Sequence, residues 1–206
     1  MPEFRKLLDG YRNFCEHEYR HERARWDALA DGQEPPVMII ACCDSRVDPA
    51  TIFDTQPGQA FVLRNVANLV PPFETGGGLH GASAAIEFGV TGLGVRHVVV
   101  MGHGACGGIK AALAGQAPGH ERSFVEDWIA ILDEPRKRVL ADPTIEDKQT
   151  ALELEAVRTS LANLRSFPFV AEREAAAELS LHGCHFSIAE GRLFVLDEAA
   201  DSFRPV

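Results

Sequence analysis

One short apolar stretch constrains the fold more than any other feature of this chain. Residues 36–43, PVMIIACC, follow a Pro-rich loop and lead into a polar segment. A continuous apolar run of this length is typical of a strand that is buried on both faces in a parallel sheet. Residues 59–66 and 95–101 are similar runs, and residues 76–93 between them carry apolar side chains at helical spacing. Strands joined by a crossover helix in this order predict an α/β fold.

Further helices are expected on both sides of these strands. Residues 3–29 are strongly charged but place apolar side chains three and four positions apart, which predicts an amphipathic helical arm. Residues 106–113 have helical character, and residues 124–180 alternate charged and apolar residues as helices do. The strands would therefore be flanked by helices.

The C-terminal part is expected to extend the sheet. Residues 181–189 and 192–197 resemble two strands joined by a short turn, which predicts an antiparallel pair. We therefore predict a single α/β domain, residues 1–206, with a mainly parallel central sheet, an antiparallel edge strand, flanking helices and an N-terminal helical arm. Its parts are the arm (1–30), the core with the candidate site (31–115), a helical region (116–180), and the C-terminal strand pair and tail (181–206).

Charge and composition exclude several classes of partner. The formal net charge is −10, whereas nucleic acid and anionic lipid attract proteins with a positive surface. No stretch reaches the roughly 18 apolar residues of a membrane span, and the charged start lacks the apolar core of a signal peptide. The five cysteines are an odd number, which favours reduced thiols over a disulfide framework. We therefore expect a cytoplasmic protein with no nucleic-acid and no membrane partner.

Two strand ends are rich in groups that bind metals or take part in catalysis. The first strand leads into Cys42, Asp44 and Arg46, and the third into His103 and Cys106. Such groups gather at the carboxyl ends of strands in open α/β sheets, so the two sets converge if the strands are neighbours. Two thiolates and an imidazole are ligands that zinc prefers, and three ligands leave a fourth position for water or substrate. Spacing alone leaves an ordinary role as small core residues equally open for the cysteines.

These residues also carry a resemblance to a known family. C-x-D-S-R at 42–46 and H-x-x-C at 103–106, with their flanks, resemble the β-class carbonic anhydrases. The likeness runs from about residue 30 to 115, returns near residue 181 and is weak elsewhere. It implies a carbonic anhydrase with one Zn²⁺ per subunit, which reversibly hydrates carbon dioxide to bicarbonate and a proton.

The resemblance also implies a role for each residue of the two motifs. Zinc would be held by Cys42, His103 and Cys106. The catalytic pair would be Asp44 and Arg46. Paired with Arg46, Asp44 stays off the metal and orients or deprotonates the water bound there. With that pair broken, Asp44 could become the fourth ligand and close the site.

Further positions match the family's substrate pocket. Gln33 matches a glutamine that hydrogen-bonds the substrate in open, plant-like members, and Ile39 stands where closing members tend to have tryptophan. We therefore expect the open type. Phe61, Val66 and Phe88 match apolar positions that line the carbon dioxide pocket from the neighbouring subunit. This implies an obligatory homodimer, alone or within a larger assembly of dimers, with the N-terminal helix packed on the partner.

Several rival interpretations use other cysteines and histidines. Residues 17–21 form an H-E-x-x-H string as in zinc peptidases, but their flanks are charged and no third ligand is near in sequence. Residues 182–185, HGCH, lie in a predicted strand, where successive side chains point to opposite faces. A redox pair of Cys42 and Cys43 would close a strained ring, and Cys43 falls at the variable position of C-x-D-S-R. We favour none of the three.

The closest alternative lies inside the family. Relatives with the same zinc ligands hydrolyse carbonyl sulfide or carbon disulfide, and a non-catalytic or bicarbonate-sensing zinc protein is a more distant possibility. The full C-x-D-S-R motif, Gln33 and the long C-terminal region favour carbon dioxide. No proton shuttle is identifiable, and His80 and His97 are candidates by residue type alone.

Overall fold

The computed structural model describes residues 1–76, 78–115 and 123–206. It consists of two compact units, Met1–Glu34 and Pro35–Val206. The first seven residues of the helical region expected at 116–180, which are residues 116–122, lie outside the described residues. No helix in the described part of the chain is long and apolar enough to cross a membrane.

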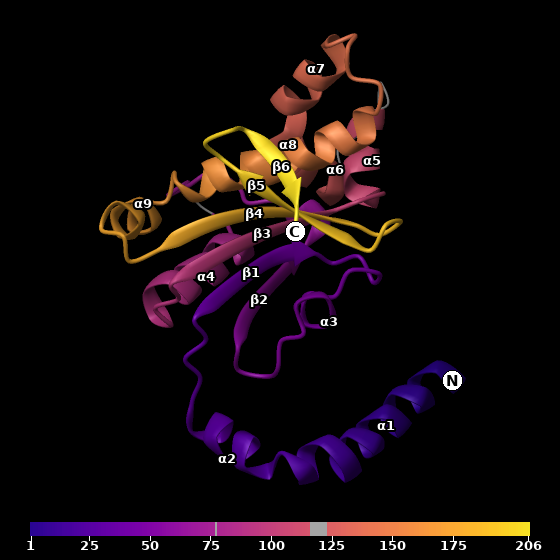
Figure 1. The fold of residues 1–206 in the computed structure, drawn as a ribbon, viewed down its shortest axis with the longest axis vertical. Helices are drawn as coiled ribbons and strands as arrows, with labels where there is room; N and C mark the ends of the chain where they lie inside the picture. The colour runs from indigo at the N-terminus through magenta and orange to yellow at the C-terminus, as the bar shows by residue number, and fades with distance from the viewer. Residues whose placement is uncertain (77, 116–122) are drawn as a thin grey trace. The chain divides into compact units, whose positions relative to one another are not determined.

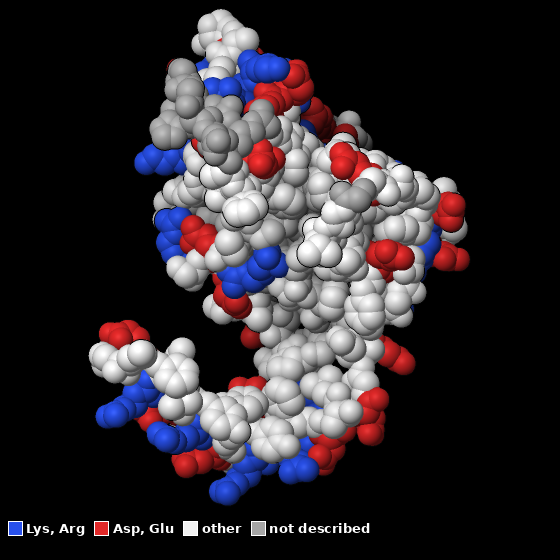
Figure 2. Space-filling view, turned by 180° about the vertical axis from the view of Figure 1, so that it is seen from behind, with Lys and Arg blue, Asp and Glu red and all other residues white. Residues whose placement is uncertain are grey.

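The N-terminal unit is helical, as its apolar spacing predicts. Helix α1 (Pro2–Phe14) continues through a π-helical turn (Cys15–Tyr19), and α2 (Arg23–Asp31) follows. Phe14, Tyr19 and Trp26 form an aromatic cluster in which ring centroids lie 5.3 to 6.1 Å apart. Acidic and basic side chains are interspersed along this unit rather than gathered into a basic patch (Figure 2).

The larger unit is built on a six-stranded sheet in the order β2-β1-β3-β4-β5-β6 (Figure 1). Neighbouring strands among the first four in this order are parallel, and β5 and β6 are antiparallel additions. The predicted mainly parallel sheet with an antiparallel edge is therefore confirmed. The strands are β1 (Val37–Cys42), β2 (Ala60–Asn65), β3 (His97–His103), β4 (Ser180–Ser187), β5 (Arg192–Asp197) and β6 (Ser202–Pro205).

Two short elements escaped the sequence analysis. Strand β6 has the sequence SFRP, which is too short and too polar to stand out as an apolar run. Helix α3 (Pro49–Phe53) is a single turn or so, capped by the Asp48 side chain, which accepts a hydrogen bond from the backbone N–H of Thr51 at 3.2 Å. Both lie outside the predicted segments and leave the fold class unchanged.

The expected helices are present with different ends. The crossover helix predicted from residue 76 begins at Gly81, and Gly78 has a φ of +147°, which no helix contains. Leu79, one of the apolar residues on which the helix predicted at 76–93 was based, is fully exposed. The helices of the larger unit after α3 are α4 (Gly81–Glu87) with a π-helical turn (Phe88–Gly92), α5 (Gly107–Ala114), α6 (Phe124–Ile129) with a 3₁₀ turn (Ala130–Leu132), α7 (Asp133–Ala141), α8 (Lys148–Leu164) and α9 (Pro168–Ala175).

Two glycines let α8 lie close against β3 and β4. A Cβ atom on Gly102 would lie 2.8 Å from a methyl of Val157. One on Gly183 would lie 2.8 Å from the other methyl of Val157 and 2.9 Å from Leu161. Such distances are too short for carbon atoms, so larger residues would push the helix away. This close approach brings the first turns of α8 to the loop that follows β3.

Candidate metal centre

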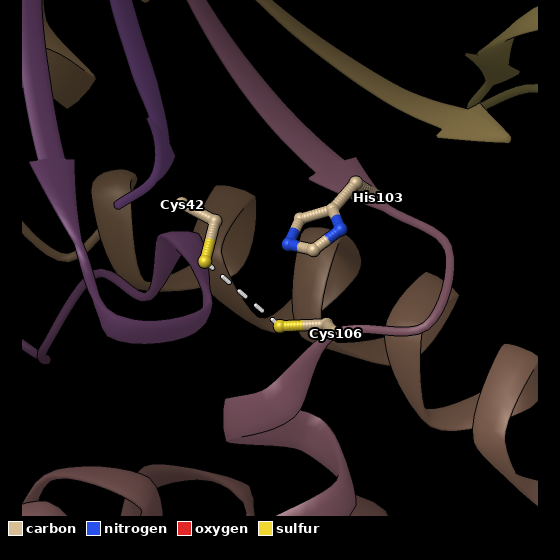
Figure 3. A group of neighbouring side chains, drawn as sticks. All are labelled: Cys42, His103 and Cys106. Carbon is tan, nitrogen blue, oxygen red and sulfur yellow. Dashed lines mark hydrogen bonds between the residues drawn. The ribbon is translucent and has the colours of Figure 1, made fainter. Parts of the chain in front are cut away.

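Three potential metal ligands converge at the carboxyl ends of β1 and β3. The two strands are parallel neighbours, so Cys42 at the end of β1 lies near His103 at the end of β3. Cys106 occupies the N-cap position of α5. One ligand atom from each of these buried residues lies within 4.8 Å of the other two. Figure 3 shows the three side chains pointing toward one another.

The spacing of the two sulfur atoms fits a tetrahedral zinc ion. The Sγ atoms of Cys42 and Cys106 are 3.9 Å apart. Two thiolates bound about 2.3 Å from one tetrahedral zinc lie about 3.8 Å from each other. Two soft sulfur ligands with one imidazole are also a donor set that suits zinc. The residues present therefore fit this metal.

The imidazole of His103 offers the right nitrogen to such a metal. Its Nδ1 lies 2.9 Å from the carbonyl oxygen of Gly104, and because a carbonyl only accepts, Nδ1 carries the proton. Nε2 then has a free lone pair, and it is buried without a hydrogen-bond partner among the described residues. A buried polar atom left without a partner is costly, and coordination of a metal ion would remove that cost.

The two thiols influence each other's ionisation. The hydrogen bond from Cys106 lowers the pKa of the Cys42 thiol to about 4, although burial opposes the change. The same contact, together with burial, raises the pKa of Cys106. Backbone N–H groups of Ile109 and Gly108, at the start of α5, act in the opposite direction on Cys106, because a helix N-terminus favours a thiolate. One thiolate is therefore ready to bind metal at neutral pH.

Asp44 and Arg46 form a tight pair beside these ligands. The Arg46 Nε and Nη2 atoms donate to the two carboxylate oxygens at 2.9 and 2.6 Å, and the Arg46 backbone N–H donates at 2.9 Å. These bonds hold the pKa of Asp44 well below its usual range, because they favour the carboxylate. Oδ2 of Asp44 lies 4.0 Å from Nε2 of His103, close to the ligand atoms but engaged with Arg46.

The apolar residues expected in the substrate pocket lie in two places. Val66 follows β2 and packs against the buried cluster that contains Cys42 and Cys106. Phe61 pairs with Met38 on β1, four residues before Cys42, which is about 13 Å along a strand. Phe88 contacts Phe61, with ring centroids 5.8 Å apart. Within one chain, Val66 therefore lies beside the metal centre and the two phenylalanines do not.

The remaining candidates stand apart from the ligand cluster. Gln33 belongs to the N-terminal unit, where it is exposed after α2, and its role stays a prediction. Cys43 is exposed and is not part of the cluster of potential ligands. His182 is exposed and lies 3.2 Å from His97, whereas His185 is buried. The two histidines of HGCH thus face different surroundings, as expected for a strand.

Sequence reasoning missed an arginine that organises the loop after β1. Arg64, on β2, donates to the carbonyl oxygens of Cys42 at 3.0 Å and Asp44 at 2.7 Å. It also pairs with the carboxylate of Asp48 at 3.0 Å. The signal was an arginine inside a mainly apolar strand, where a charged residue needs partners.

Sequence reasoning also missed three residues that form a hydrogen-bonded group at the backbone of Cys106. Glu153, on α8, accepts a hydrogen bond from the backbone N–H of Cys106 at 3.0 Å. Gln149, one turn earlier, donates to the carbonyl oxygen of Cys106 at 3.1 Å, and His185 lies 3.1 Å from Glu153. A carboxylate on the apolar stripe of a helix was the available signal, but nothing in the sequence connected it with Cys106.

Comparison with known proteins identifies a consistent set of relatives. A family model described as carbonic anhydrase matches residues 37–193. The chain is 37% identical over 192 residues to β carbonic anhydrase 3 of Arabidopsis thaliana, covering 90% of this chain and 74% of that one. It is 36% identical over 190 residues to the chloroplastic β carbonic anhydrase 5 of the same plant, covering 91% of this chain but only 62% of that longer one.

Solved structures agree with this grouping. The β-carbonic anhydrase CcaA superposes with a TM-score of 0.93 at 31% identity, over 100% of this chain and 93% of that chain. One of two tetrameric β-carbonic anhydrases from Sordaria macrospora superposes with a TM-score of 0.81 at 28% identity, over 96% and 98% of the two chains. The likeness includes the whole sheet and the helices around it.

We predict that removing either cluster cysteine abolishes zinc binding, whereas removing their neighbour does not. Cys42→Ala and Cys106→Ala each leave two ligands, so zinc per chain should fall from about 1 to below about 0.1 after dialysis. Cys43→Ala and Cys184→Ala are matched controls that should keep their zinc. The measurement is metal analysis of the folded proteins. Zinc retained by Cys106→Ala, or lost from Cys43→Ala, would contradict the assignment.

Proposed function

The chain belongs to the β-carbonic anhydrase family, and we propose that it catalyses the zinc-dependent, reversible hydration of carbon dioxide to bicarbonate and a proton. The observation that carries this proposal is the buried cluster of Cys42, His103 and Cys106 beside the Asp44–Arg46 pair. The donor set fits one zinc ion per chain. The family supports the reaction, and the geometry of the cluster supports the cofactor.

The metal and the residues around the cluster would have different roles in the reaction. When bound there, zinc would lower the pKa of water and supply hydroxide as a nucleophile at neutral pH. Asp44 Oδ2 is the carboxylate oxygen beside His103 Nε2, so it can accept a hydrogen bond from the reacting water and orient it. Because Arg46 keeps its pKa low, Asp44 is a weak base. It therefore suits orientation better than long-term storage of the proton.

Arg46 would keep the fourth ligand position accessible. Its guanidinium holds the Asp44 carboxylate and also donates to the carbonyl oxygen of Ala105 at 3.0 Å. Ala105 lies in the loop between His103 and Cys106, so Arg46 ties the carboxylate to the ligand loop. We propose that this arrangement corresponds to the open type of site, in which Asp44 stays off the metal.

We further propose a homodimer, or a larger assembly of dimers, with composite active sites. Gln33 would hydrogen-bond the substrate, and Phe61, Val66 and Phe88 would line the carbon dioxide pocket. Phe61 and Phe88 would reach the pocket from the neighbouring subunit, whereas Val66, expected there too, lies beside the cluster of its own chain. In support, Phe61 pairs with Met38, four residues along the strand from Cys42 of its own chain. Phe88 packs against Phe61 and is half-exposed. A structural relative from Sordaria macrospora is tetrameric.

We propose that the enzyme acts in the cytoplasm on dissolved carbon dioxide and bicarbonate. All five cysteines are free thiols in the structure, which fits a reducing compartment. Nucleic acid and membranes are not proposed as partners, because the net charge of −10 gives neither of them an electrostatic attraction.

We predict rapid carbon dioxide hydration by the zinc-loaded protein in a stopped-flow assay with a pH indicator. Cys106→Ala should lower the rate by about 10³-fold or more, because the nucleophile is then no longer generated at neutral pH. Cys43→Ala should match the wild type. Carbonyl sulfide, offered to the same preparation, should be a poor substrate. Fast sulfide release with slow hydration of carbon dioxide would replace the proposed reaction by the hydrolysis of carbonyl sulfide.

We predict that Arg46→Ala closes the site. Freed from Arg46, Asp44 can bind the metal, so the hydration rate should fall by about 10²-fold. In the cobalt-substituted protein, azide should no longer change the visible spectrum of the metal. Azide binding should return in the double variant Asp44→Asn/Arg46→Ala.

The matched control for this prediction is Arg192→Ala. Arg192 is an exposed arginine that lies 3.9 Å from the carboxylate of Glu190 on the surface. Its removal should leave both the rate and the azide response unchanged. If Arg46→Ala still binds azide as the wild type does, Arg46 has no gating role.

We predict that two inactive variants restore activity when they are co-assembled. Phe88→Ala lacks a pocket residue and Cys106→Ala lacks a ligand, but a hybrid dimer holds one intact site if the sites are composite. After unfolding and refolding of an equal mixture, about one quarter of the wild-type rate is expected for random pairing of subunits in a symmetric dimer. Recovery no greater than the mean of the two separate variants would show that Phe88 acts within its own chain.

A further inference from the structure

Two side chains on one turn of helix α8 form hydrogen bonds with both backbone groups of Cys106, one of the three proposed metal ligands. Glu153 accepts the N–H of Cys106 at 3.0 Å, and Gln149 donates to the carbonyl oxygen of Cys106 at 3.1 Å. The two side chains also bond to each other, because Gln149 Nε2 donates to Glu153 Oε1 at 2.7 Å. They are four positions apart, which places them on the same face of the helix. The peptide groups on both sides of Cys106 are therefore fixed from one direction.

The carboxylate in this arrangement is deeply buried. Glu153 has 1% of its surface exposed, and it lies among the apolar residues that α8 turns toward the sheet. A buried carboxylate is costly unless its oxygens accept hydrogen bonds. Here Cys106, Gln149 and His185 satisfy the two oxygens, with His185 Nε2 at 3.1 Å from Oε2. Packing alone does not explain why a carboxylate stands at this buried position.

His185 holds the far side of that carboxylate. It lies on β4, the strand next to β3, and it lines a cavity of about 430 Å³ together with Gly104, Ala105, Leu154 and other residues. Glu153 is not among the residues that line this cavity. The imidazole therefore stands between the carboxylate and the cavity, where it can keep water from competing for the Glu153 oxygens.

The loop that this group restrains has an unusual backbone. Ala105, directly before Cys106, has a φ of +55°, in the left-handed region that residues with a Cβ rarely adopt. Such a conformation persists only where surrounding contacts hold it. From one side Arg46 donates to the carbonyl oxygen of Ala105. From the other side Glu153 and Gln149 hold the next residue.

We propose that Glu153, with Gln149 and His185, is a positioning unit that fixes Cys106 in the orientation required for the metal. It does so through the backbone of Cys106, and none of the three residues touches the ligand atoms. The inference rests on the proposed zinc site and adds residues to it that lie outside the ligand motifs. Outer partners of metal ligands of this kind change metal affinity or activity by about 10- to 100-fold when they are replaced.

The test is the zinc affinity of Glu153→Gln, measured by competition with a chromophoric chelator. The amide keeps the shape of the side chain, but its NH₂ group cannot accept the bonds that one carboxylate oxygen accepts now. Zinc affinity should fall by about 10- to 100-fold. With cobalt in place of zinc, the thiolate-to-cobalt absorption band should shift or weaken, because the geometry at Cys106 has changed.

The matched control is Glu155→Gln on the same helix. Glu155 pairs with Arg138 and Arg158 at 3.1 Å each, away from Cys106. The same substitution there should leave zinc affinity and the cobalt spectrum as in the wild type. Gln149→Met serves as a second variant, since it removes one bond to Cys106 without burying a new polar group. It should lower zinc affinity in a folded protein even if Glu153→Gln does not fold.

The outcomes separate this inference from the function on which it rests. If the wild type binds zinc tightly and both variants bind it within about twofold of the wild type, the three residues stabilise the fold only and the inference is wrong, whatever happens to the melting temperature. If the wild type binds no zinc, the proposed function itself fails. His185→Gln, which can still donate to Glu153, should retain more zinc affinity than His185→Leu.

Discussion

Parallel pairing of β1 with β3 is the contact on which the rest of the site depends. Met38 to Ala41 lie beside Val98 to Met101, so the two strands end at the same edge of the sheet. Cys42 and His103, which are far apart in the sequence, become neighbours for this reason alone. The strands can lie in the centre of the sheet because their residues are almost all apolar and buried on both faces.

The ligands are buried, and charged groups near a buried site are costly unless they have partners. The charged groups around this site are accordingly paired. Arg46 neutralises Asp44 at the exposed side of the cluster, and Arg64 ties the loop after β1 to β2. On the inner side, the buried Glu153 carboxylate receives hydrogen bonds from three groups. Each charged side chain near the cysteines therefore has a hydrogen-bonding partner that fixes its orientation. Fixed charges of this kind need little reorganisation when a reaction develops charge beside them.

The sequence was sufficient for five of the six strands and for the candidate ligands, but not for the short strand β6 or for the residues that support the ligands. Apolar runs identified β1, β2 and β3, because buried parallel strands leave that pattern, and the resemblance joined Cys42 to His103 and Cys106. Residues such as Arg64 and Glu153 act through backbone atoms of residues distant in sequence, and no local pattern reveals such contacts. Helix α4 was placed too early because the periodicity of residues 76–93 did not show that Gly78 would have a backbone conformation outside the helical region.

The loop between His103 and Cys106 is held from two opposite sides, and this has a consequence for how the site can change. Glu153 and Gln149 fix Cys106 from α8, whereas Arg46 holds Ala105 through one bond that also belongs to the Asp44 pair. Glu153 is buried and Gln149 is partly buried, but the Arg46 side chain is half-exposed. A rearrangement of the site is therefore easier at Arg46 than at Cys106. In the closed form that we propose for Arg46→Ala, the Asp44 carboxylate would move while Cys106 stays where Glu153 and Gln149 hold it.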